Sequence, residues 1–464
     1  MTVSARHIAF GFFVFHLVVA RQIALFDDEA YYTLWARDLV WGYYDHPPMI
    51  AYMIRAGTSM FGETAFGVRF FGVVGMGVAS LLVGDITRLL GGNSAQASLA
   101  VVLFNFSILV MGVGSFATPD APSTVFWIAA LWASVHAIQS GHGRWWIGAG
   151  ILIGLGGLSK FTNVFFAFGM LGWLICTANG RRMLRTWRPY AAIGCAIGVL
   201  VPYLVWNTQT DWLGLERQGG RLAVTGLQPK FILEYVVVFF LLPTPLVTWF
   251  ALKAIRMRAP NIGLLLWSIG PVLIYFLFHA SHSQVQANWL TPVQGPIAIL
   301  AALALGGWSV KARGTVGMAV VMTCGLLGAA FNPWHPIGTA DNPPNQTRGW
   351  DAARADIEAQ IDASSATWIA TTSYAMTGML AYQFQNLPVW SVDELQRYGF
   401  RGDFPDPLCE ATGLLIERTK IAPDLANGLF ETVGEISTVR RMQGETELQS
   451  YRLRQVEGPH LCGD

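Results

Sequence analysis

Charged residues are scarce in this chain. Only 13% of its 464 residues are charged, whereas a soluble domain has about 25%. The 30 basic and 29 acidic residues nearly balance, so nothing in the composition attracts a nucleic acid or another acidic polymer. Hydrophobic residues make up 53% of the chain, and its mean hydropathy is +0.43. The composition excludes a soluble enzyme, a disordered chain and a nucleic-acid-binding protein, and it predicts a polytopic α-helical membrane protein.

Cysteine is also rare, with five residues, and no two of them have the spacing of a structural zinc site. Cys176, Cys195 and Cys324 lie in apolar runs, where cysteine behaves as a small hydrophobic side chain. Cys409 and Cys462 lie in the polar C-terminal part and can pair in an oxidising compartment. The sequence leaves open whether they do.

The glycine-rich motifs of nucleotide-binding proteins are missing as well. No GxGxxG or phosphate-loop pattern occurs, and Lys160 is preceded by Leu158 and Ser159 where a phosphate loop has glycine before its lysine. Gly150 and Gly154 have the spacing of small residues at helix contacts in membranes. Nucleotide-dependent chemistry is unsupported, and no nucleotide partner is expected.

Apolar runs that can cross a membrane recur through most of the chain. A span needs about 20 residues, and we place about eleven spans. The first follows Arg6 and His7 and is expected to be an uncleaved transmembrane helix, because no small-residue cleavage site follows it. The predicted spans cover residues 8–26, 66–87, 95–113, 121–138, 145–158, 161–178, 190–207, 232–252, 261–279, 289–307 and 314–331.

The connectors between these runs predict the orientation. Cytoplasmic loops are rich in Lys and Arg, and strict alternation of the spans places every short basic connector on one side. The other side, periplasmic in a bacterium, receives residues 27–65, 114–120, the turn at Lys160, 208–231, 280–288 and the tail. Those segments hold carboxylates, histidines and aromatic residues, so function is expected on the periplasmic face.

The tail over residues 333–464 is polar and mixed in pattern. Trp368-Ile-Ala and Gly413-Leu-Leu-Ile-Glu predict short strands, and residues 350–361 have the apolar spacing of a helix. We therefore predict two domains. A transmembrane domain covers residues 1–332, with its first periplasmic loop at 27–65 containing interfacial helices, and a small periplasmic α/β domain covers residues 333–464.

Three adjacent carboxylates, Asp27, Asp28 and Glu29, follow the first span. Charge directly after a membrane span is costly unless it is used, which favours chemistry. Acidic residues also stabilise the first turn of a helix, and residues 30–41 have the pattern of an amphipathic interfacial helix. Catalysis and helix capping both remain open for this segment.

The same loop continues with Tyr44, Asp45 and His46, followed by Pro47 and Pro48. A double proline stops the preceding helix and fixes an extended turn. Such a turn can direct Asp45 and His46 towards the three carboxylates. The alternative is an ordinary rigid loop with solvated polar groups.

Asp120 and Lys160 lie at two further turns of the outer side. Asp120 follows Pro119 and either caps the next span or belongs to a site. Lys160 interrupts two apolar runs, which is explained either by snorkelling of its ammonium to the interface or by phosphate binding.

Further polar residues of the outer face complete the candidate set: Arg69, Arg217, His282 and Asn288. Each can be an interfacial anchor. Independent caps and anchors need not all fall on one membrane face, however, and this convergence favours a site.

Taken in order, these motifs resemble a known family. The chain resembles the bacterial branch of the protein-mannosyltransferase-like GT-C glycosyltransferases. The motifs that carry this resemblance are Asp28-Glu29-Ala-Tyr-Tyr, Asp45-His46-Pro47-Pro48, Gly62, Arg69, Thr118-Pro119-Asp120 and Leu158-Ser159-Lys160. Lipid A aminoarabinose transferases and lipopolysaccharide-core galacturonosyltransferases are relatives in that group. The resemblance covers about residues 24–300 and is specific as a set, whereas the tail matches only loosely.

The resemblance implies a GT-C fold and an enzyme that takes a sugar from a polyprenyl-phosphate donor outside the cytoplasm. The acceptor would be lipopolysaccharide, a lipid or another envelope glycan. In such families the acid of the first loop is the catalytic candidate, which carries over to Asp28 as general base or hydrogen-bond acceptor for the acceptor hydroxyl. Asp120 resembles the second acidic position, and Glu29 would support Asp28. In-line attack would invert the anomeric configuration of the donor.

The resemblance also implies residues that bind the donor phosphate. Lys160 and Arg69 would neutralise the departing polyprenyl phosphate, with Tyr44 and His46 beside them. His46 stands where the aminoarabinose transferases have lysine, which leaves its charge at neutral pH open. The remaining candidates would contact substrate: Asp45, Arg217, His282 and Asn288.

A transporter or flippase for a lipid-linked saccharide is the main alternative. Transporters place ionisable residues near the bilayer midplane and commonly have repeated halves, whereas these spans are nearly free of charge and show no repeat. A non-catalytic assembly subunit is the third hypothesis, which the joint presence of Asp28, Asp120 and Lys160 disfavours. The sequence identifies neither the sugar nor the acceptor. It also leaves a divalent metal ion open, with Glu29 and Asp45 as candidate ligands.

Overall fold

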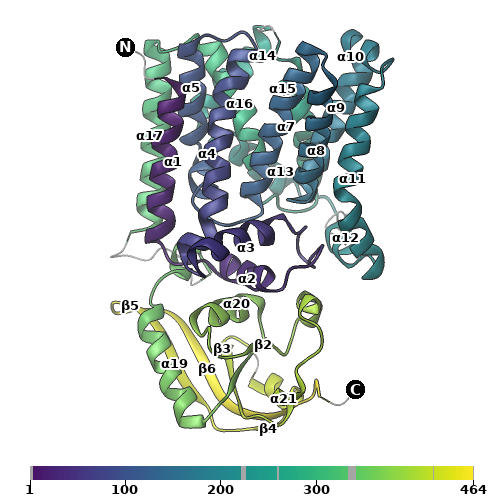
Figure 1. Ribbon diagram of the computed structural model, residues 1–464. Coiled ribbons are helices and arrows are strands. Elements are labelled where there is room, and N and C mark those ends of the chain that lie inside the picture. Colours follow the sequence, from purple (N-terminus) through teal and green to yellow (C-terminus); the bar gives the residue numbers. More distant parts are fainter. Residues whose placement is uncertain (1–3, 221–225, 259–260, 333–340, 422, 463–464) are drawn as a thin grey trace. The chain divides into compact units, whose positions relative to one another are not determined.

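The computed structural model describes residues 4–220, 226–258, 261–332, 341–421 and 423–462 (Figure 1). They form two compact units. The first consists of the chain up to Ala20, Asp45–Gly57 and Arg69–Leu326, and the second of Arg21–Tyr44, Thr58–Val68 and the chain from Leu327 onwards. The predicted first outer loop is thus divided, since its two ends cluster with the tail and its middle, Asp45–Gly57, clusters with the first unit. The domain limits drawn at residue 332 stay a prediction.

The first unit is helical throughout its described part (Figure 1). Its main helices coincide with the predicted apolar runs: α1 (Ala5–Gln22), α4 (Ala65–Leu89), α5 (Ser94–Asn105), α6 (Ile108–Val113), α7 (Asp120–Ser140), α8 (Gly143–Gly157), α9 (Val164–Cys176), α11 (Arg188–Gln209), α13 (Pro229–Leu241), α14 (Pro245–Arg256), α15 (Gly263–His279), α16 (Gln294–Leu305) and α17 (Val310–Ala330). Shorter helices connect them: α3 (Met49–Phe61), η1 (Phe161–Asn163), α10 (Ala178–Met183), α12 (Leu213–Gly219) and η3 (Ala287–Val293).

Several of these helices can cross a membrane. Within the described residues, five are long and apolar enough, or seven if each of two bent helix pairs is one span. The chain is thus a multi-pass helical protein, and the finer count of about eleven spans stays a prediction. The run at 232–252, predicted as one span, is broken: α13 and α14 meet at 91°. Pro243 and Pro245 flank the break, and Thr244 between them has a φ of +77°.

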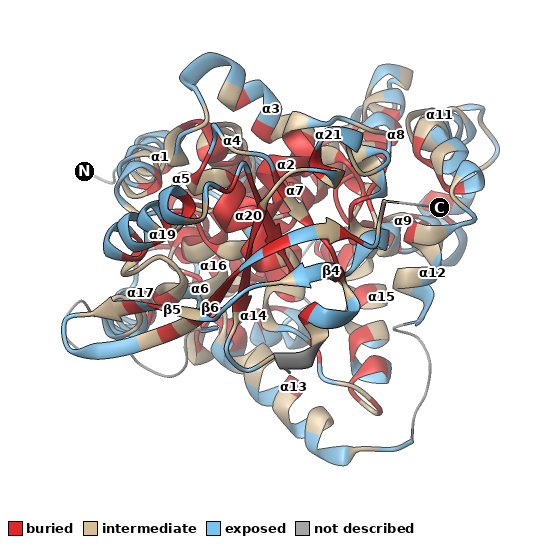
Figure 2. Cartoon of the chain, turned by 90° about the horizontal axis from the view of Figure 1, so that it is seen from below, coloured by how far each residue is buried: buried red, intermediate tan, exposed pale blue. Residues whose placement is uncertain are grey.

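The core of the first unit lies around α7 and α16, which are mostly buried, whereas few residues of α11 and α17 are buried (Figure 2). Exposed apolar faces of this kind suit contact with lipid. Helices α8 and α11 approach closely through the two glycines expected at a helix contact. A Cβ at Gly150 would lie 2.2 Å from the Ala192 carbonyl oxygen, and a Cβ at Gly154 would lie 2.7 Å from Cβ of Val199.

The second unit is an α/β structure built on a six-stranded sheet. The strand order is β2-β1-β3-β6-β4, with β5 also paired to β6; β1 is parallel to β2 and β3, and the pairs with β6 are antiparallel. The strands are β1 (Trp368–Thr371), β2 (Val389–Ser391), β3 (Gly413–Arg418), β4 (Phe430–Val433), β5 (Ser437–Gln443) and β6 (Thr446–Pro459). The two strands predicted from sequence, β1 and β3, are confirmed and are neighbours.

Helices accompany the sheet in the second unit: α2 (Asp27–Arg37), α18 (Pro343–Gln346), α19 (Trp350–Ser364), α20 (Tyr374–Gln383), α21 (Asp406–Cys409), η4 (Leu395–Arg397), η5 (Gly399–Arg401) and η6 (Pro423–Gly428). Helix α19 confirms the predicted helix at 350–361. Helix α2 confirms the helix expected after the three acids, although it begins at Asp27 and ends at Arg37, four residues before the predicted end. It packs against α20 (Figure 1).

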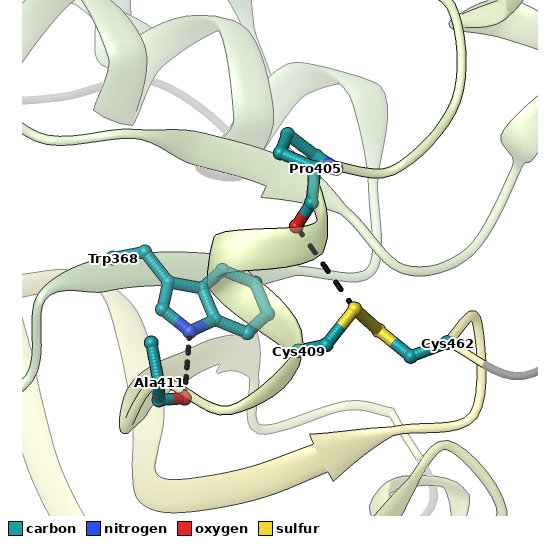
Figure 3. The surroundings of a disulfide bond; sticks show 5 residues. All are labelled: Trp368, Pro405, Cys409, Ala411 and Cys462. Atoms are coloured by element: carbon teal, nitrogen blue, oxygen red, sulfur yellow. Dashed lines mark hydrogen bonds between the residues drawn. A yellow bond between two sulfur atoms is a disulfide. The ribbon is translucent and has the colours of Figure 1, made fainter.

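A disulfide joins Cys409 and Cys462, which the sequence left open (Figure 3). It connects α21 to the residues that follow β6. Trp368 of β1 lies beside it and donates its indole N–H to the carbonyl oxygen of Ala411 at 3.2 Å. The bond closes this edge of the sheet around a small apolar core.

Candidate active site

In the first unit, the candidate residues gather around a buried ion pair. Lys160 Nζ lies 2.5 Å from Asp120 Oδ1, and the two side chains are only 7% and 4% exposed. Lys160 has extended backbone between α8 and η1, because α8 ends at Gly157 and the chain turns before α9. Asp120 is the first residue of α7. The helix N-terminus adds a favourable dipole to its carboxylate.

Asn288 completes this group. Its Nδ2 donates to Asp120 Oδ2 at 2.7 Å, so both oxygens of the carboxylate have a partner. Asn163 fixes the same corner, since its Oδ1 accepts from the hydroxyl of Ser123 at 2.5 Å. Three segments far apart in sequence, at residues 120, 160 and 288, therefore meet at one point. Removal of one partner alone from a buried ion pair of this kind strongly destabilises the folded protein.

A cavity of about 350 Å³ lies beside the pair, entirely within the first unit. Lys160 supplies its ammonium and His46 its imidazole, while Thr162 and Gln218 add neutral polar groups. The rest of the lining is apolar or aromatic: Phe161, Val164, Phe165, Leu215, Gly219, Tyr275, Phe276 and Trp289. One cationic end in an otherwise apolar wall suits an anionic headgroup attached to a hydrocarbon chain.

The loop of Asp45 and His46 belongs to this region. Gln218 of α12 donates to the Asp45 carbonyl oxygen at 2.7 Å, and Arg217 Nε lies 3.9 Å from Asp45 Oδ1. The role predicted for the double proline is wrong in one respect. Helix α2 already ends at Arg37, and the prolines instead precede α3, which begins at Met49. Their fixed φ suits the start of a helix.

Arg69 and His282 are buried but do not line this cavity. Arg69 Nη1 donates to the carbonyl oxygen of Ala20 at 3.0 Å, and its guanidinium lies 5.2 Å from the ring of Phe116. His282 packs edge-on against His279, with ring centroids 5.1 Å apart. These contacts support the helix ends, and the phosphate-binding role of Arg69 and the substrate-binding role of His282 stay predictions.

In the second unit, the three adjacent carboxylates have three different surroundings. Asp27 lies 3.5 Å from Arg418, and burial raises its pKa to about 6 despite that guanidinium. Glu29 is fully buried and accepts the backbone N–H of Phe26 at 3.1 Å, which is the capping role that the sequence left open. Asp28 is exposed and accepts the hydroxyl of Tyr374 at 3.3 Å.

Tyr374 is itself held by the tail. Its backbone N–H donates to Glu394 Oε2 at 2.9 Å, and its ring contacts that of Tyr31 edge-on at 5.2 Å. The guanidinium of Arg397 lies 4.6 Å from the centre of the Tyr374 ring and 5.5 Å from that of Tyr44. Tyr44, a predicted phosphate ligand, therefore belongs to an aromatic and cationic group near Asp28 in the second unit.

The structure gives no direct support for a metal ion. Among the residues it describes, no group of three or more His, Cys, Asp and Glu side chains can hold one. Glu29, one suggested ligand, belongs to the second unit and already caps α2; Asp45, the other, belongs to the first. Metal dependence stays a prediction.

Two functional candidates were missed from sequence. Arg397 lies in the tail, where the family motifs end, and nothing in its local pattern indicates a role. Gln218, in the short helix α12, is an uncharged residue beside the charged Glu216 and Arg217 and was passed over for Arg217. Only the fold brings each next to a recognised acid: Arg397 through Tyr374 to Asp28, and Gln218 through a hydrogen bond to Asp45.

Comparison with known proteins places this arrangement in context. The profile of the family described as dolichyl-phosphate-mannose-protein mannosyltransferase matches residues 45–206. The lipid A galacturonosyltransferase RgtD of Rhizobium johnstonii is 25% identical over 341 residues, which are 71% of this chain and 70% of RgtD. An undecaprenyl phosphate-alpha-4-amino-4-deoxy-L-arabinose arabinosyl transferase of Sodalis glossinidius is 24% identical over 64% of this chain. The match spans 57% of that relative's length.

Solved structures agree on the fold. The apo crystal structure of ArnT from Cupriavidus metallidurans superposes with a TM-score of 0.71, and the match covers 97% of each chain at 14% identity. The same protein bound to undecaprenyl phosphate gives a TM-score of 0.69 at 15% identity, over 98% of each chain. At this level of identity the likeness establishes the architecture.

Proposed function

Because this chain is a multi-pass membrane glycosyltransferase with the GT-C fold of ArnT and is related to lipid A galacturonosyl- and aminoarabinose transferases, we propose that it modifies a bacterial envelope glycolipid. It transfers a sugar from a polyprenyl-phosphate donor to lipopolysaccharide, another lipid or another glycan. The reaction takes place on the periplasmic face of the inner membrane, which the chain crosses about eleven times.

The cavity beside Lys160 is the observation that carries this proposal. Its apolar and aromatic wall accepts the first isoprene units of a lipid, and its one ammonium meets the phosphate. A nucleotide sugar has no such hydrocarbon chain and would leave this wall exposed to water. A lipid-linked donor also explains why the sequence has no nucleotide-binding motif.

Lys160 binds the phosphate that leaves when the sugar–phosphate bond breaks. An ammonium has three N–H donors, and the contact with Asp120 uses one of them, so two can serve phosphate oxygens. Asp120, fixed by Asn288, balances the charge of the lysine and aims its ammonium within the apolar wall. As negative charge develops on the leaving phosphate, this preset ammonium stabilises the transition state.

Asp28 is the general base that accepts the proton of the acceptor hydroxyl. It is exposed, whereas Asp27 is ion-paired and Glu29 caps α2. Attack of the activated hydroxyl in line with the leaving phosphate inverts the anomeric centre. His46, in the cavity wall, is the second donor to the phosphate, and Asp45 with Arg217 holds that loop. Arg69, His282 and Tyr44 act as supports of neighbouring segments.

Periplasmic orientation of the second unit is supported by its disulfide. Structural disulfides persist in the periplasm and are rare in the cytosol. The basic connectors predicted on the opposite side agree with this orientation.

A comparison of lipid extracts tests the proposal. Wild-type, Asp28→Asn and deletion strains are brought to equal membrane abundance where the protein is present, and polyprenyl-phosphate sugars and envelope glycolipids are measured by mass spectrometry. We expect Asp28→Asn and deletion to lose the same sugar from one glycolipid while its polyprenyl-phosphate form accumulates. If Asp28→Asn keeps every glycolipid and deletion alone removes one, Asp28 is not the base and a transport role becomes the better explanation.

A further inference from the structure

We infer that Tyr374, a residue of the C-terminal α/β part of the chain, is the positioning residue for Asp28. This inference rests on the proposed function, in which Asp28 is the base. The tail then has a direct part in the transfer step, through one hydroxyl group and the helix that carries it.

The contact itself is a hydrogen bond between α20 and α2. Tyr374 begins α20 and Asp28 lies in the first turn of α2, and the hydroxyl lies 3.3 Å from Asp28 Oδ1. An exposed aspartate samples several rotamers, and a donor on one oxygen selects among them. A carboxylate offers about four lone-pair sites, so this bond leaves capacity for a substrate hydroxyl.

Three contacts besides Asp28 hold the tyrosine. Glu394 accepts its backbone N–H, and Arg397 both pairs with Glu394 at 3.4 Å and covers the tyrosine ring. Tyr31 contacts the same ring edge-on and donates its own hydroxyl to the carbonyl oxygen of Arg397 at 3.3 Å. The side chain therefore has little freedom to turn away from α2.

Helices α2 and α20 are held together at three levels. At their first turns Tyr374 meets Asp28. In the middle, a Cβ at Gly378 would lie 2.5 Å from the backbone nitrogen of Tyr31, so only glycine permits this approach. At their ends, Arg37 donates to the carbonyl oxygen of Ala381 at 2.9 Å. The two helices run side by side in the same direction, as a rigid support for the base (Figure 1).

Tyrosine suits this role chemically. Burial, together with the charge of Asp28, raises the pKa of Tyr374 above its ordinary value, so the hydroxyl keeps its proton at neutral pH. It can donate to the carboxylate without competing as an acid in the reaction. A lysine or arginine in this place would form an ion pair and hold the base more firmly, at the expense of its basicity.

Tyr374→Phe tests the inference, with Tyr398→Phe as the matched control. The Tyr398 ring belongs to the same aromatic group, 6.0 Å from that of Tyr31, and is not one of the contacts that hold Tyr374. Both variants remove one hydroxyl, and Tyr374→Phe removes the hydrogen bond to Asp28. Transfer is measured as the initial rate of glycolipid modification in membranes with the native donor pool, and ligand binding as the affinity of the purified protein for undecaprenyl phosphate. We expect Tyr374→Phe to lower the rate about tenfold, the lower range for a hydrogen bond to a charged group. Its affinity for undecaprenyl phosphate should stay within experimental error of wild type, and its melting temperature should fall by no more than a few degrees, as the loss of one hydrogen bond allows.

The result that overturns the inference is equal transfer by Tyr374→Phe and Tyr398→Phe, or a loss of transfer in Tyr374→Phe that is matched by lost binding of undecaprenyl phosphate or by a smaller amount of folded protein. Asp28→Asn in the same assays separates this failure from failure of the proposed function. If Asp28→Asn is inactive while Tyr374→Phe equals its control, only the positioning role is lost. If Asp28→Asn is active, the assignment of the base is itself wrong, and the positioning role falls with it.

Discussion

Variants of the buried pair of Lys160 and Asp120 can separate the contribution of these charges to stability from their contribution to phosphate binding. At a distance of 2.5 Å and exposures of 7% and 4%, the pair belongs to the class in which removal of one partner costs about 3–5 kcal/mol. Replacement of both partners by neutral side chains of similar volume is often close to neutral. We therefore expect Lys160→Met and Asp120→Asn each to lower the melting temperature of the solubilised protein, and the double variant to recover much of the loss.

The same three variants should rank differently when undecaprenyl phosphate is added. A ligand that binds only the folded state raises stability by RT ln(1 + [L]/Kd). Asp120→Asn leaves an ammonium without its carboxylate, so this variant should be stabilised more than wild type. Lys160→Met and the double variant lack the ammonium and should gain little, and neither should transfer sugar.

Two outcomes would refute this reasoning. If the single variants melt at the wild-type temperature, the pair is not buried in the folded protein in its membrane environment. If the double variant is stabilised by undecaprenyl phosphate as strongly as wild type, Lys160 does not bind the phosphate. Melting curves with dodecyl phosphate as a short-chain control show whether the isoprene wall of the cavity contributes.

Three further predictions concern the second unit. Asp27 has a pKa of about 6 in the folded protein against an ordinary value of 3.8, so protonation of Asp27 favours the folded state. The free energy of unfolding should therefore fall by up to about 3 kcal/mol as pH rises from about 4 through 6. Denaturant unfolding of Asp27→Asn should lack this part of the pH dependence. Replacing Cys409 and Cys462 by serine opens a bridge with a sequence separation of 53 and should cost about 2–4 kcal/mol, seen as a lower melting temperature that no longer responds to dithiothreitol. Gly378→Ala inserts a methyl group against the α2 backbone and should reduce sugar transfer at least as much as Tyr374→Phe does. Gly399→Ala places its methyl group in open space and should leave transfer unchanged. Equal activity of the two variants would contradict the close approach of α2 and α20.

The parts of the fold that depend on local pattern are predictable from sequence. Apolar runs of sufficient length became helices almost wherever they occur, and Gly150 and Gly154 mark a real helix contact. The break at Thr244 was overlooked because hydropathy alone does not register that prolines stand on both sides of one residue. The helix of the three acids was predicted, but its partner α20 begins 346 residues after Asp28, and no periodicity connects the two.

The candidate site was predictable as a set of residues and not as an arrangement. Topology placed Asp120, Lys160 and Asn288 on one face, and the structure brings all three to one point. Arg69 and His282 lie on the same predicted face, where Arg69 bonds to α1 and His282 packs against His279, and the roles predicted for them stay predictions. A residue on the right face can serve a helix end as well as a substrate, and only contacts distinguish the two.

The two acids with proposed roles are supported in opposite ways, and the difference follows from their tasks. Asp120 is buried and bound by a cation, whose charge it balances in an apolar wall. Asp28 is exposed and bound by a neutral hydroxyl, which orients it and leaves it able to accept a proton. The pair of Lys160 and Asp120 also limits how tightly the phosphate is bound. Because Asp120 already balances the charge of the ammonium, the polyprenyl phosphate product is held weakly enough to leave.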